Sequence, residues 1–196
     1  MSTPTTIHAI DEADLERRFG LPRPEVANKV QPRLTEWMAR FIQHSPFAVM
    51  ATSTSKGECD VSPKGGGPGF VTILDDQTLL IPDYAGNNLF FGHKNLMDNP
   101  RVALLFLIPG EGWCVRVNGP AQIVDDQASM AAMGLAPHGE KPRLGIRVNI
   151  EECFSHCPKA LTRSDIWNPE KRTRLPKRPD PLGGWMAEIQ ARMREP

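Results

Sequence analysis

The 196-residue sequence is short of cysteine and has no excess charge of either sign, and both shortages exclude classes of protein. Four cysteines (Cys59, Cys114, Cys153 and Cys157) are too few and too scattered for a disulfide framework in a chain of this length. Free thiols and a reducing compartment are therefore expected. The 23 Lys and Arg residues equal the 23 Asp and Glu residues, so the total charge predicts no attraction to nucleic acid or to an anionic membrane. Any anion site must be local.

Long hydrophobic runs are also missing. The longest apolar stretch, VALLFLI at residues 102–108, is far shorter than the roughly twenty residues that a helix needs to cross a bilayer. The first twenty residues contain no basic segment followed by an apolar run, as a secretory signal requires. A cytoplasmic protein without a membrane partner is expected.

Several catalytic motifs are absent. The sequence has no HExxH, no Walker loop and no GxSxG, which leaves metalloprotease, P-loop and hydrolase functions without support. Cys153, His156 and Cys157 could belong to a metal site, but no fourth ligand is evident, and buried apolar thiols are the preferred interpretation. No metal is expected. The basic segment from Lys171 to Arg178 lacks interleaved aromatic residues, so nucleic acid is not an expected partner.

The pattern in the middle of the chain is mainly β. About seven short β-rich pieces separated by turn signals predict a barrel or sandwich. These pieces are FAVMAT from Phe47, VTIL from Val71, TLLI from Thr78, VALLFLI from Val102, CVRV from Cys114, AQIV from Ala121 and LGIRVNI from Leu144.

Helices are predicted around these strands. Residues 10–19 form a short helix stopped by Gly20, and a firmer helix follows Pro32 with one apolar face that should pack on a sheet. Helical spacing of apolar residues and His93 predicts a helix over 87–99, with Gly86 or Asn87 as N-cap. Further helices are expected from Asp125 or Asp126, after Pro158 with Lys159, Arg163 and Trp167 on one face, and around Trp185, Ile189 and Met193.

Three regions follow from this pattern. Residues 1–32 form an N-terminal arm, residues 33–167 form the main domain, and residues 168–196 form a basic, Pro-rich arm with a C-terminal helix.

The segment DVSPKGGGPG, from Asp60 to Gly69, interrupts the β pattern with one lysine among residues of minimal bulk. Glycines such as Gly65 leave backbone amides accessible to an anion, and Lys64 would supply positive charge. The alternative is a flexible hairpin loop with a solvated lysine. Two other segments could join this loop around a phosphorylated ligand. The predicted helix start at Asn87 and Asn88 would offer amides and the helix dipole, and the helix after Pro158 would offer cations and an aromatic ring.

The order SPFAVMATSTSKGECDVSPKGG, LLIPDYAGNN, NPRVALLFLIPG and VRVNGPAQI resembles the pyridoxamine 5′-phosphate oxidase-like FMN-binding split-barrel superfamily over roughly residues 34–167. The ending CFSHCPKALTRSDIW resembles a branch of FMN-dependent flavoproteins more than the true oxidases. The resemblance implies a mainly β (α+β) fold, a six-stranded Greek-key split β-barrel with flanking helices. It also implies a homodimer with FMN at the subunit interface.

The resemblance also implies cofactor contacts. Ala51 and Thr52 would lie along the flavin, and the strand that carries Ser62, Pro63, Lys64 and Gly65 would hold the FMN phosphate. The turn with Pro82, Asp83, Asn87 and Asn88 would contact the ring and the phosphate. The oxidases carry a Ser-Arg-Lys run where this chain has Gly86, Asn87 and Asn88, so Lys159 and Arg163 of the opposite subunit would replace the missing charge. Trp167 would add an aromatic ring. Cys114 stands where the oxidases have a flavin-adjacent glutamine.

The function implied is that of an FMN-dependent oxidoreductase acting on a small organic substrate, with no catalytic residue identified. The substrate-phosphate motif of the oxidases has no match, which argues against pyridoxamine phosphate as substrate. The alternative is a non-catalytic module that binds flavin, deazaflavin or haem for storage or sensing.

Overall fold

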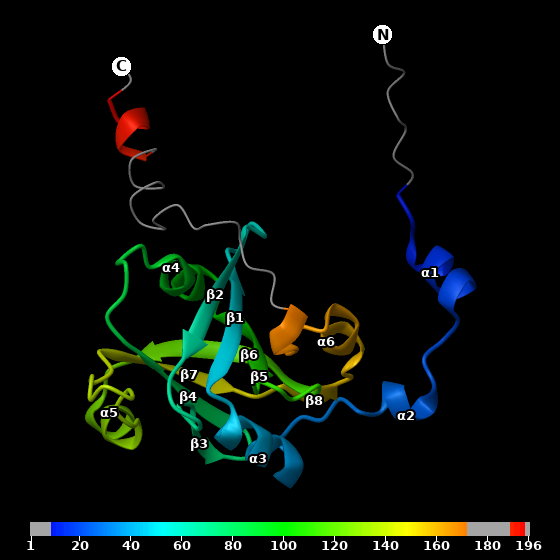
Figure 1. Ribbon diagram of the computed structural model, residues 1–196, viewed down its shortest axis with the longest axis horizontal. Coiled ribbons are helices and arrows are strands. Elements are labelled where there is room, and N and C mark those ends of the chain that lie inside the picture. The colour runs from blue at the N-terminus through cyan, green and yellow to red at the C-terminus, as the bar shows by residue number, and fades with distance from the viewer. Residues whose placement is uncertain (1–8, 172–188, 195–196) are drawn as a thin grey trace. The chain divides into compact units, whose positions relative to one another are not determined.

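An eight-stranded antiparallel sheet forms most of the first unit of the chain (Figure 1). The computed structural model describes residues 9–171 and 189–194, and the chain divides into two units, Met1–Cys157 and Pro158–Pro196. The strand order is β2-β1-β5-β6-β7-β4-β3, and β8 pairs with β6. The strands are β1 (Phe47–Ser53), β2 (Cys59–Gly65), β3 (Thr72–Asp75), β4 (Thr78–Asp83), β5 (Arg101–Leu107), β6 (Cys114–Val124), β7 (Leu144–Asn149) and β8 (Glu152–His156).

Strand β6 connects the two halves of this sheet. Its first part, Cys114 to Asn118, pairs with β8, and its last part, Ala121 to Val124, pairs with β7. Gly119 lies between the two parts, opposite Val102 of β5. A methyl group on Gly119 would overlap the carbonyl oxygen of Asn149 at the end of β7, so only glycine allows this close approach.

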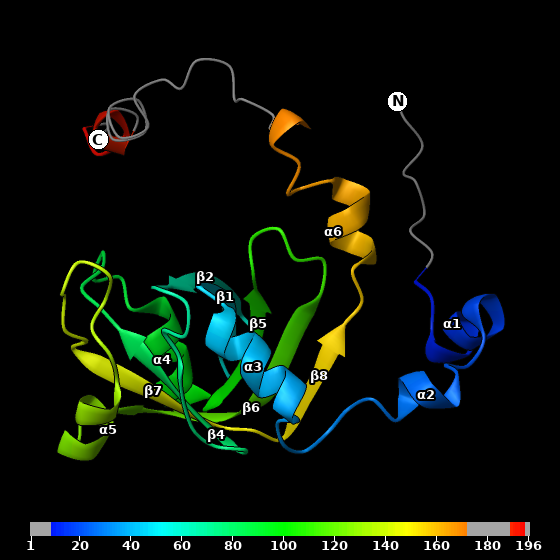
Figure 2. The same cartoon turned by 60° about the horizontal axis from the view of Figure 1, so that its bottom comes forward.

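The core fills the space that the curved sheet encloses. Alternating residues of the central strands point inward, as the period of two in a β-strand requires. Helix α3 (Glu36–His44) covers the core with its apolar face and packs against β3 and β6 (Figure 2). The buried set includes Met38, Phe41, Ile42, Ala48, Met50, Leu79, Ile81, Leu104, Phe106, Val115, Val117, Ile146 and Val148. The mainly β (α+β) fold class and the packing of this helix on the sheet are confirmed.

The residue pattern did not predict strand β2, and only the family resemblance implied a strand that carries Ser62, Pro63 and Lys64. Ser62, Pro63 and Gly65 are poor strand formers, and the pattern therefore indicated a break at this point. Seven consecutive pairs with β1 override that local preference, from Phe47 opposite Gly65 to Ser53 opposite Cys59. The loop begins only at Gly66, after the strand has ended.

The predicted strand pieces differ from the observed strands in two other ways. The pieces from Cys114 and Ala121 are one strand, β6, and the pairing partner β8 was missed. The sheet thus has eight strands, of which the pattern located six.

Most predicted helices exist, with shifted ends. Helix α1 (Glu12–Phe19) ends at Gly20, a separate short helix α2 (Pro24–Ala27) follows, and α5 (Gln127–Ala132) is capped by Asp126. Helix α4 (Phe91–Asp98) begins four residues later than predicted. Residues 189–192 of the predicted C-terminal helix are helical, while Trp185 lies outside the described residues.

The second unit contains α6 (Lys159–Ser164), followed by a 3₁₀ turn at Pro169–Lys171. Asp165 takes a left-handed conformation with φ of 50° and ends α6, so Trp167 does not share a helix face with Lys159 and Arg163. In the part of the chain that the structure describes, no helix has the length and apolar character to span a membrane.

The four cysteines are free thiols in two environments. Cys59 and Cys157 are exposed, whereas Cys114 and Cys153 are buried, so the interpretation of Cys157 as a buried residue was wrong. Burial raises the pKa of Cys153 to about 11. Burial, with a smaller contribution from Cys157, also raises the pKa of Cys114.

The close approach at Gly119 gives a test of the fold. Replacing Gly119 by Ala should lower the free energy of unfolding by about 3 kcal/mol or more, because the new methyl group meets backbone on a neighbouring strand. Gly134→Ala is the matched control, since no atom lies within 4 Å of the place that its new methyl group would occupy. Urea denaturation of both variants measures the effect, and equal stability of the two would contradict the proposed role of Gly119.

The thiol environments predict a reactivity pattern. A thiol reagent at neutral pH should modify Cys59 and Cys157 rapidly in the native protein, and Cys114 and Cys153 only after unfolding. The buried thiols lack both access and thiolate, since a raised pKa keeps the unreactive protonated form. Mass spectrometry of alkylated peptides identifies the modified positions, and fast labelling of Cys153 in the native protein would be inconsistent with its burial.

Candidate functional site

A cavity of about 480 Å³ lies between β2, at one end of the sheet, and the end of β4. Strand β2 provides one wall, the end of β4 and the following loop provide another, and the first turn of α4 closes the cavity. The lining consists of Met50, residues 60–65, and residues 82–93. The cavity thus joins segments from separate parts of the sequence within the first unit.

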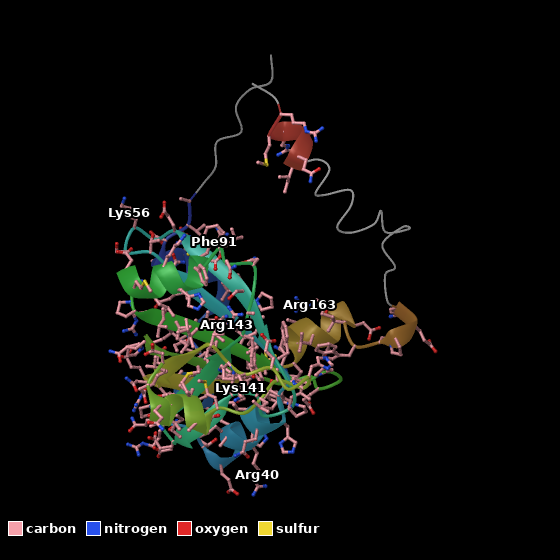
Figure 3. All side chains as sticks on the ribbon, turned by 90° about the vertical axis from the view of Figure 1, so that its left-hand side faces the viewer. Arg40, Lys56, Phe91, Lys141, Arg143 and Arg163 are labelled. Atoms are coloured by element: carbon pink, nitrogen blue, oxygen red, sulfur yellow. The ribbon has the colours of Figure 1, made fainter. Side chains whose placement is uncertain are left out.

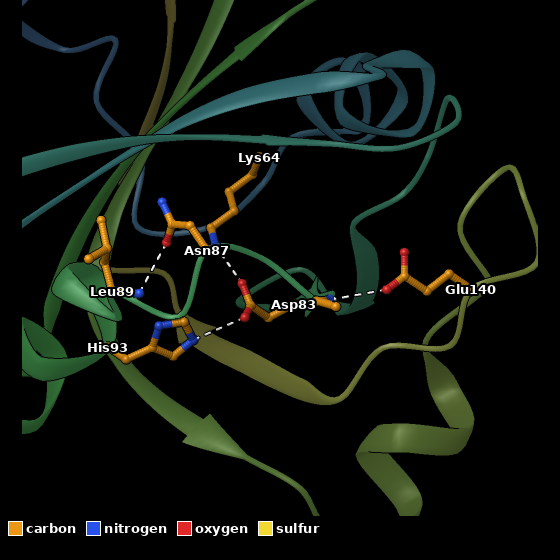
Figure 4. A network of polar contacts seen from close by, with 7 residues as sticks. Lys64, Asp83, Asn87, Leu89, His93 and Glu140 are labelled. Carbon is orange, nitrogen blue, oxygen red and sulfur yellow. Dashed lines mark hydrogen bonds and ion pairs between the residues drawn. The ribbon is translucent and has the colours of Figure 1, made fainter. Parts of the chain in front are cut away.

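A network of charged side chains crosses the cavity (Figure 4). Lys64 Nζ of β2 lies 2.5 Å from Asp83 Oδ1 at the end of β4. His93 Nε2 of α4 lies 3.1 Å from the other carboxylate oxygen of Asp83, without the alignment of a hydrogen bond. The three side chains are only 13–15% exposed. Because β2 and β4 are not paired, the ion pair joins two strands that no backbone hydrogen bond connects.

The alternation of β2 determines which of its side chains face this cavity. Asp60, Ser62 and Lys64 share the half-buried face of the strand, and Val61 and Pro63 point the other way. Asp60 also faces α4, because a methyl group on Gly92 would lie 3.9 Å from its Oδ2 atom. The charged groups on the β2 wall are therefore one cation and one carboxylate.

The loop from Tyr84 to Phe90 replaces the first turn of the predicted helix. Asn88 and Phe90 adopt left-handed conformations with φ of 60° and 57°, which interrupt the helix before Phe91. The Asn87 side-chain oxygen accepts a hydrogen bond from the Leu89 amide at 3.1 Å, within the loop. The prediction that amides near Asn87 belong to a helix N-terminus was thus wrong.

Two contacts attach this loop to its surroundings. The Ala85 amide donates to Glu140 Oε1 at 3.1 Å, and the Arg143 amide donates to the Asp83 carbonyl at 2.8 Å. Both partners lie in the segment that precedes β7. Burial and, to a smaller extent, the Glu140 charge raise the pKa of Tyr84. Its phenol is therefore a neutral hydrogen-bond donor at neutral pH.

The apolar part of the cavity is aromatic. Phe90 and Phe91 border it, and Phe90 contacts the His93 ring edge-on with centroids 5.5 Å apart. Leu89 and Met50 complete this side. A flat apolar ligand with polar substituents would find both kinds of contact in one cavity.

Eight residues predicted as cofactor contacts line the cavity: Ser62, Pro63, Lys64, Gly65, Pro82, Asp83, Asn87 and Asn88. Ala51, Thr52 and Cys114 do not line it. Ala51 pairs with Val61 and Ala103 on the opposite face of β1, and the buried Thr52 hydroxyl accepts a hydrogen bond from Asn95 Nδ2 at 3.0 Å. Buried Cys114 lies opposite His156 in the β6–β8 ladder.

The remaining predicted contacts belong to the second unit. Lys159 and Arg163 are exposed on α6, and Trp167 follows that helix.

Within the first unit, charged side chains are spread over the surface: Figure 3 shows Arg40 and Lys56 at its opposite ends. Among the side chains that line the cavity, Lys64 is the only lysine or arginine, and Asp60 and Asp83 are the carboxylates.

Sequence reasoning missed Asp60, Tyr84 and His93. The resemblance implied a strand at Ser62 to Gly65, and the period of two along DVSPK would have placed Asp60 on the same face as Lys64. Tyr84 lies inside the IPDYAGNN motif and is the only tyrosine of the chain. His93 fitted the helical spacing of apolar residues and was interpreted as part of that face, although it points to Asp83.

Two further features bear on alternative sites. Among the described residues, no group of three or more His, Cys, Asp or Glu side chains is arranged to hold a metal ion. A second cavity of about 440 Å³ is lined by Trp37, Phe41, Ile108, Glu111, Trp113 and Ser155. Its lining includes a carboxylate and no basic side chain, so it is not suited to a phosphate.

Solved structures similar to this chain include three of interest. HupZ of Group A Streptococcus is 21% identical, with 62% of this chain and 93% of that chain covered and a TM-score of 0.47. A Lactobacillus delbrueckii protein assigned as a pyridoxamine 5′-phosphate oxidase is 25% identical, with 63% and 95% covered and a TM-score of 0.47. An FMN-binding protein of Syntrophomonas wolfei is 8% identical, with 60% and 86% covered and a TM-score of 0.43.

A search of curated proteins found no match. The family described as Pyridoxamine 5′-phosphate oxidase matches residues 34–157, which include every strand of the sheet and the whole cavity lining. Because this match spans more than half of the sequence, the chain belongs to the pyridoxamine 5′-phosphate oxidase family.

Proposed function

We propose that this protein binds FMN in the cavity between β2, β4 and α4 and acts as an FMN-dependent oxidoreductase on a small organic substrate. The observation that carries the proposal is the convergence of Lys64, neutral polar groups and aromatic side chains around one cavity. Family membership supports a flavin as the ligand class.

The donor set of the cavity fits FMN in kind. Lys64 provides a cation for the phosphate, and Asn87, Asn88 and the neutral Tyr84 phenol provide hydrogen-bonding groups for the ribityl chain or the ring edge. Phe90, Phe91 and neighbouring apolar residues would pack against the flat ring. When bound, FMN would supply the hydride chemistry, and the chain would hold the ring, orient the substrate and exclude water.

The charge of the cavity falls short of what a phosphate needs. A phosphate monoester carries about −1.5 to −2 charges at neutral pH, whereas the cavity has one lysine and two carboxylates. Additional cations are required, and we assign this role to Lys159 and Arg163 of a second copy of the chain. Their exposure on α6 and their basic character support this assignment, and Trp167 would accompany them.

A homodimer would also cover an apolar face of the sheet. On β1, β2 and β5, the residues between the inward-facing ones point away from the core and are half-buried or exposed. This outer face comprises Phe47, Val49, Ala51, Val61, Pro63, Ala103, Leu105 and Leu107. Arg101, at the start of β5, is the charged residue of these strands that shares this face, which lies on the reverse of the β2 wall of the cavity. A second copy seated on this outer face would be adjacent to the proposed FMN site.

A cofactor titration tests the proposal directly. Purified protein should take up FMN with a change in flavin absorbance or fluorescence, and the bound flavin should pass electrons from a reduced nicotinamide to an acceptor. Protein that takes up no flavin would refute the proposal. Flavin binding without transfer to any acceptor would instead favour a non-catalytic flavin-binding module.

Replacing Lys64 separates the phosphate contact from the ring contacts. Lys64→Ala should weaken FMN binding by about 10- to 100-fold, because a charge-assisted contact is lost and Asp83 remains as a repulsive carboxylate. Riboflavin, which lacks the phosphate, should bind almost as before. Lys94→Ala is the matched control, since Lys94 is exposed on α4 and outside the cavity lining. Fluorescence titrations measure the affinity of the unmodified protein and of both variants for FMN and for riboflavin. Equal losses of FMN and riboflavin affinity in Lys64→Ala would oppose a phosphate contact at Lys64.

A charge on the outer face should break the dimer. Leu105→Glu places a carboxylate at the centre of this face, opposite Val49, and desolvating it in an interface is unfavourable. We expect a monomer by sedimentation equilibrium and weaker FMN binding, because the second copy no longer supplies cations. Leu74→Glu, at an exposed position of β3, should leave the oligomeric state unchanged. A Leu105→Glu dimer with normal FMN affinity would rule out this face as the interface.

A further inference from the structure

Asp83 lies between two basic groups that it does not contact equally. Its Oδ1 atom is 2.5 Å from Lys64 Nζ in a hydrogen-bonded ion pair. Its Oδ2 atom is 3.1 Å from His93 Nε2, and this second contact lacks hydrogen-bond alignment. The Asp83 carboxylate therefore forms its hydrogen-bonded ion pair with Lys64, while His93 lies beside it without a hydrogen bond (Figure 4).

An anion that binds Lys64 changes this balance. The phosphate competes with Asp83 for the same ammonium group, and a carboxylate left without a cation in a largely buried position is strongly unfavourable. Asp83 needs another positive partner, and His93 is the nearest basic group. Histidine is the side chain that most readily gains a charge near neutral pH.

We propose that His93 takes up a proton from solvent when the FMN phosphate binds Lys64, so that Asp83 exchanges a lysine partner for an imidazolium partner. The inference rests on the proposed FMN site and assigns to His93 a role in recognising the phosphorylated cofactor over its dephosphorylated form. The proton adds to the ring nitrogen that carries no hydrogen in the neutral form, so that Nε2, which faces the carboxylate, bears a hydrogen in the imidazolium. No other bond is made or broken.

The surroundings of His93 are consistent with this role. Strand β2 contributes Lys64 and Asp60, and β4 contributes Asp83. Strand β1 contains no charged residue, and the one charged residue of β6, Arg116, lies over the Phe154 ring on β8. On α4 itself, Lys94 is exposed and outside the cavity lining. Two carboxylates and a single lysine leave the cavity with a deficit of positive charge that one imidazolium would offset.

Calorimetry can measure the proton directly. FMN and riboflavin are titrated into flavin-free protein in buffers of different ionisation enthalpy at about pH 7.5, where a phosphate monoester is nearly a dianion. We expect uptake of up to about one proton per FMN and almost none per riboflavin. A lysine contact alone would favour the dianion and release protons from the phosphate, so uptake has the opposite sign to the simplest alternative.

Three variants assign the proton to its residue. His93→Gln should abolish the uptake and weaken FMN binding roughly tenfold, with riboflavin affinity unchanged. Asp83→Asn should also abolish the uptake but strengthen FMN binding, because the competing carboxylate is gone. His44→Gln is the matched control, since His44 belongs to α3 and lies outside the cavity lining. Its proton uptake should equal that of the unmodified protein.

The outcomes separate this inference from the proposed function. FMN binding without proton uptake, or with the same uptake in His93→Gln, would overturn the role of His93 and leave the FMN site intact. Weaker FMN binding in Asp83→Asn would also overturn it, because the carboxylate would then favour the cofactor. A protein that binds no FMN would overturn the proposed function together with this inference.

Discussion

The fold depends on one strand that belongs to two halves of a sheet. Strand β6 pairs with β5 and β8 along its first part and with β7 along its last part, and Gly119 lies at the change of partners. A flat sheet could not accommodate both sets of neighbours, so the sheet curves around the core. This curvature brings β2 and β4 toward each other without letting them pair. The cavity is the place where the sheet does not close.

A gap between strands closed by side chains has different chemistry from one closed by backbone. Lys64 and Asp83 join β2 to β4 through an ion pair, which a competing anion can separate more readily than a ladder of backbone hydrogen bonds. The groups that join these two strands are thus the same groups that a ligand would contact. Phosphate binding to Lys64 would compete with the Lys64–Asp83 ion pair. A proton on His93 would then give Asp83 a new positive partner.

The sequence predicted the fold class, the central strands and most of the helices, because their hydrophobic periodicity agrees with their tertiary role. It located Lys64 and Asp83 through the motifs around them. Its hydrophobic pattern could not identify β2, which only the family resemblance implied, since Ser62 and Pro63 disfavour a strand that only pairing with β1 enforces. Nor could it assign His93, because a helical pattern does not tell which residue of a face meets the core and which meets a carboxylate from another strand. Contacts between residues far apart in the sequence determine both the formation of β2 and the position of His93 beside Asp83.

Strand β2 forms one end of the sheet, and a free strand edge is a template on which further chains can assemble. Pro63 stands in the middle of this strand and has no amide hydrogen to donate. An additional strand would therefore lack one of the donors that a continuous ladder needs. A residue that borders the ligand cavity thus also opposes the addition of further strands at this edge.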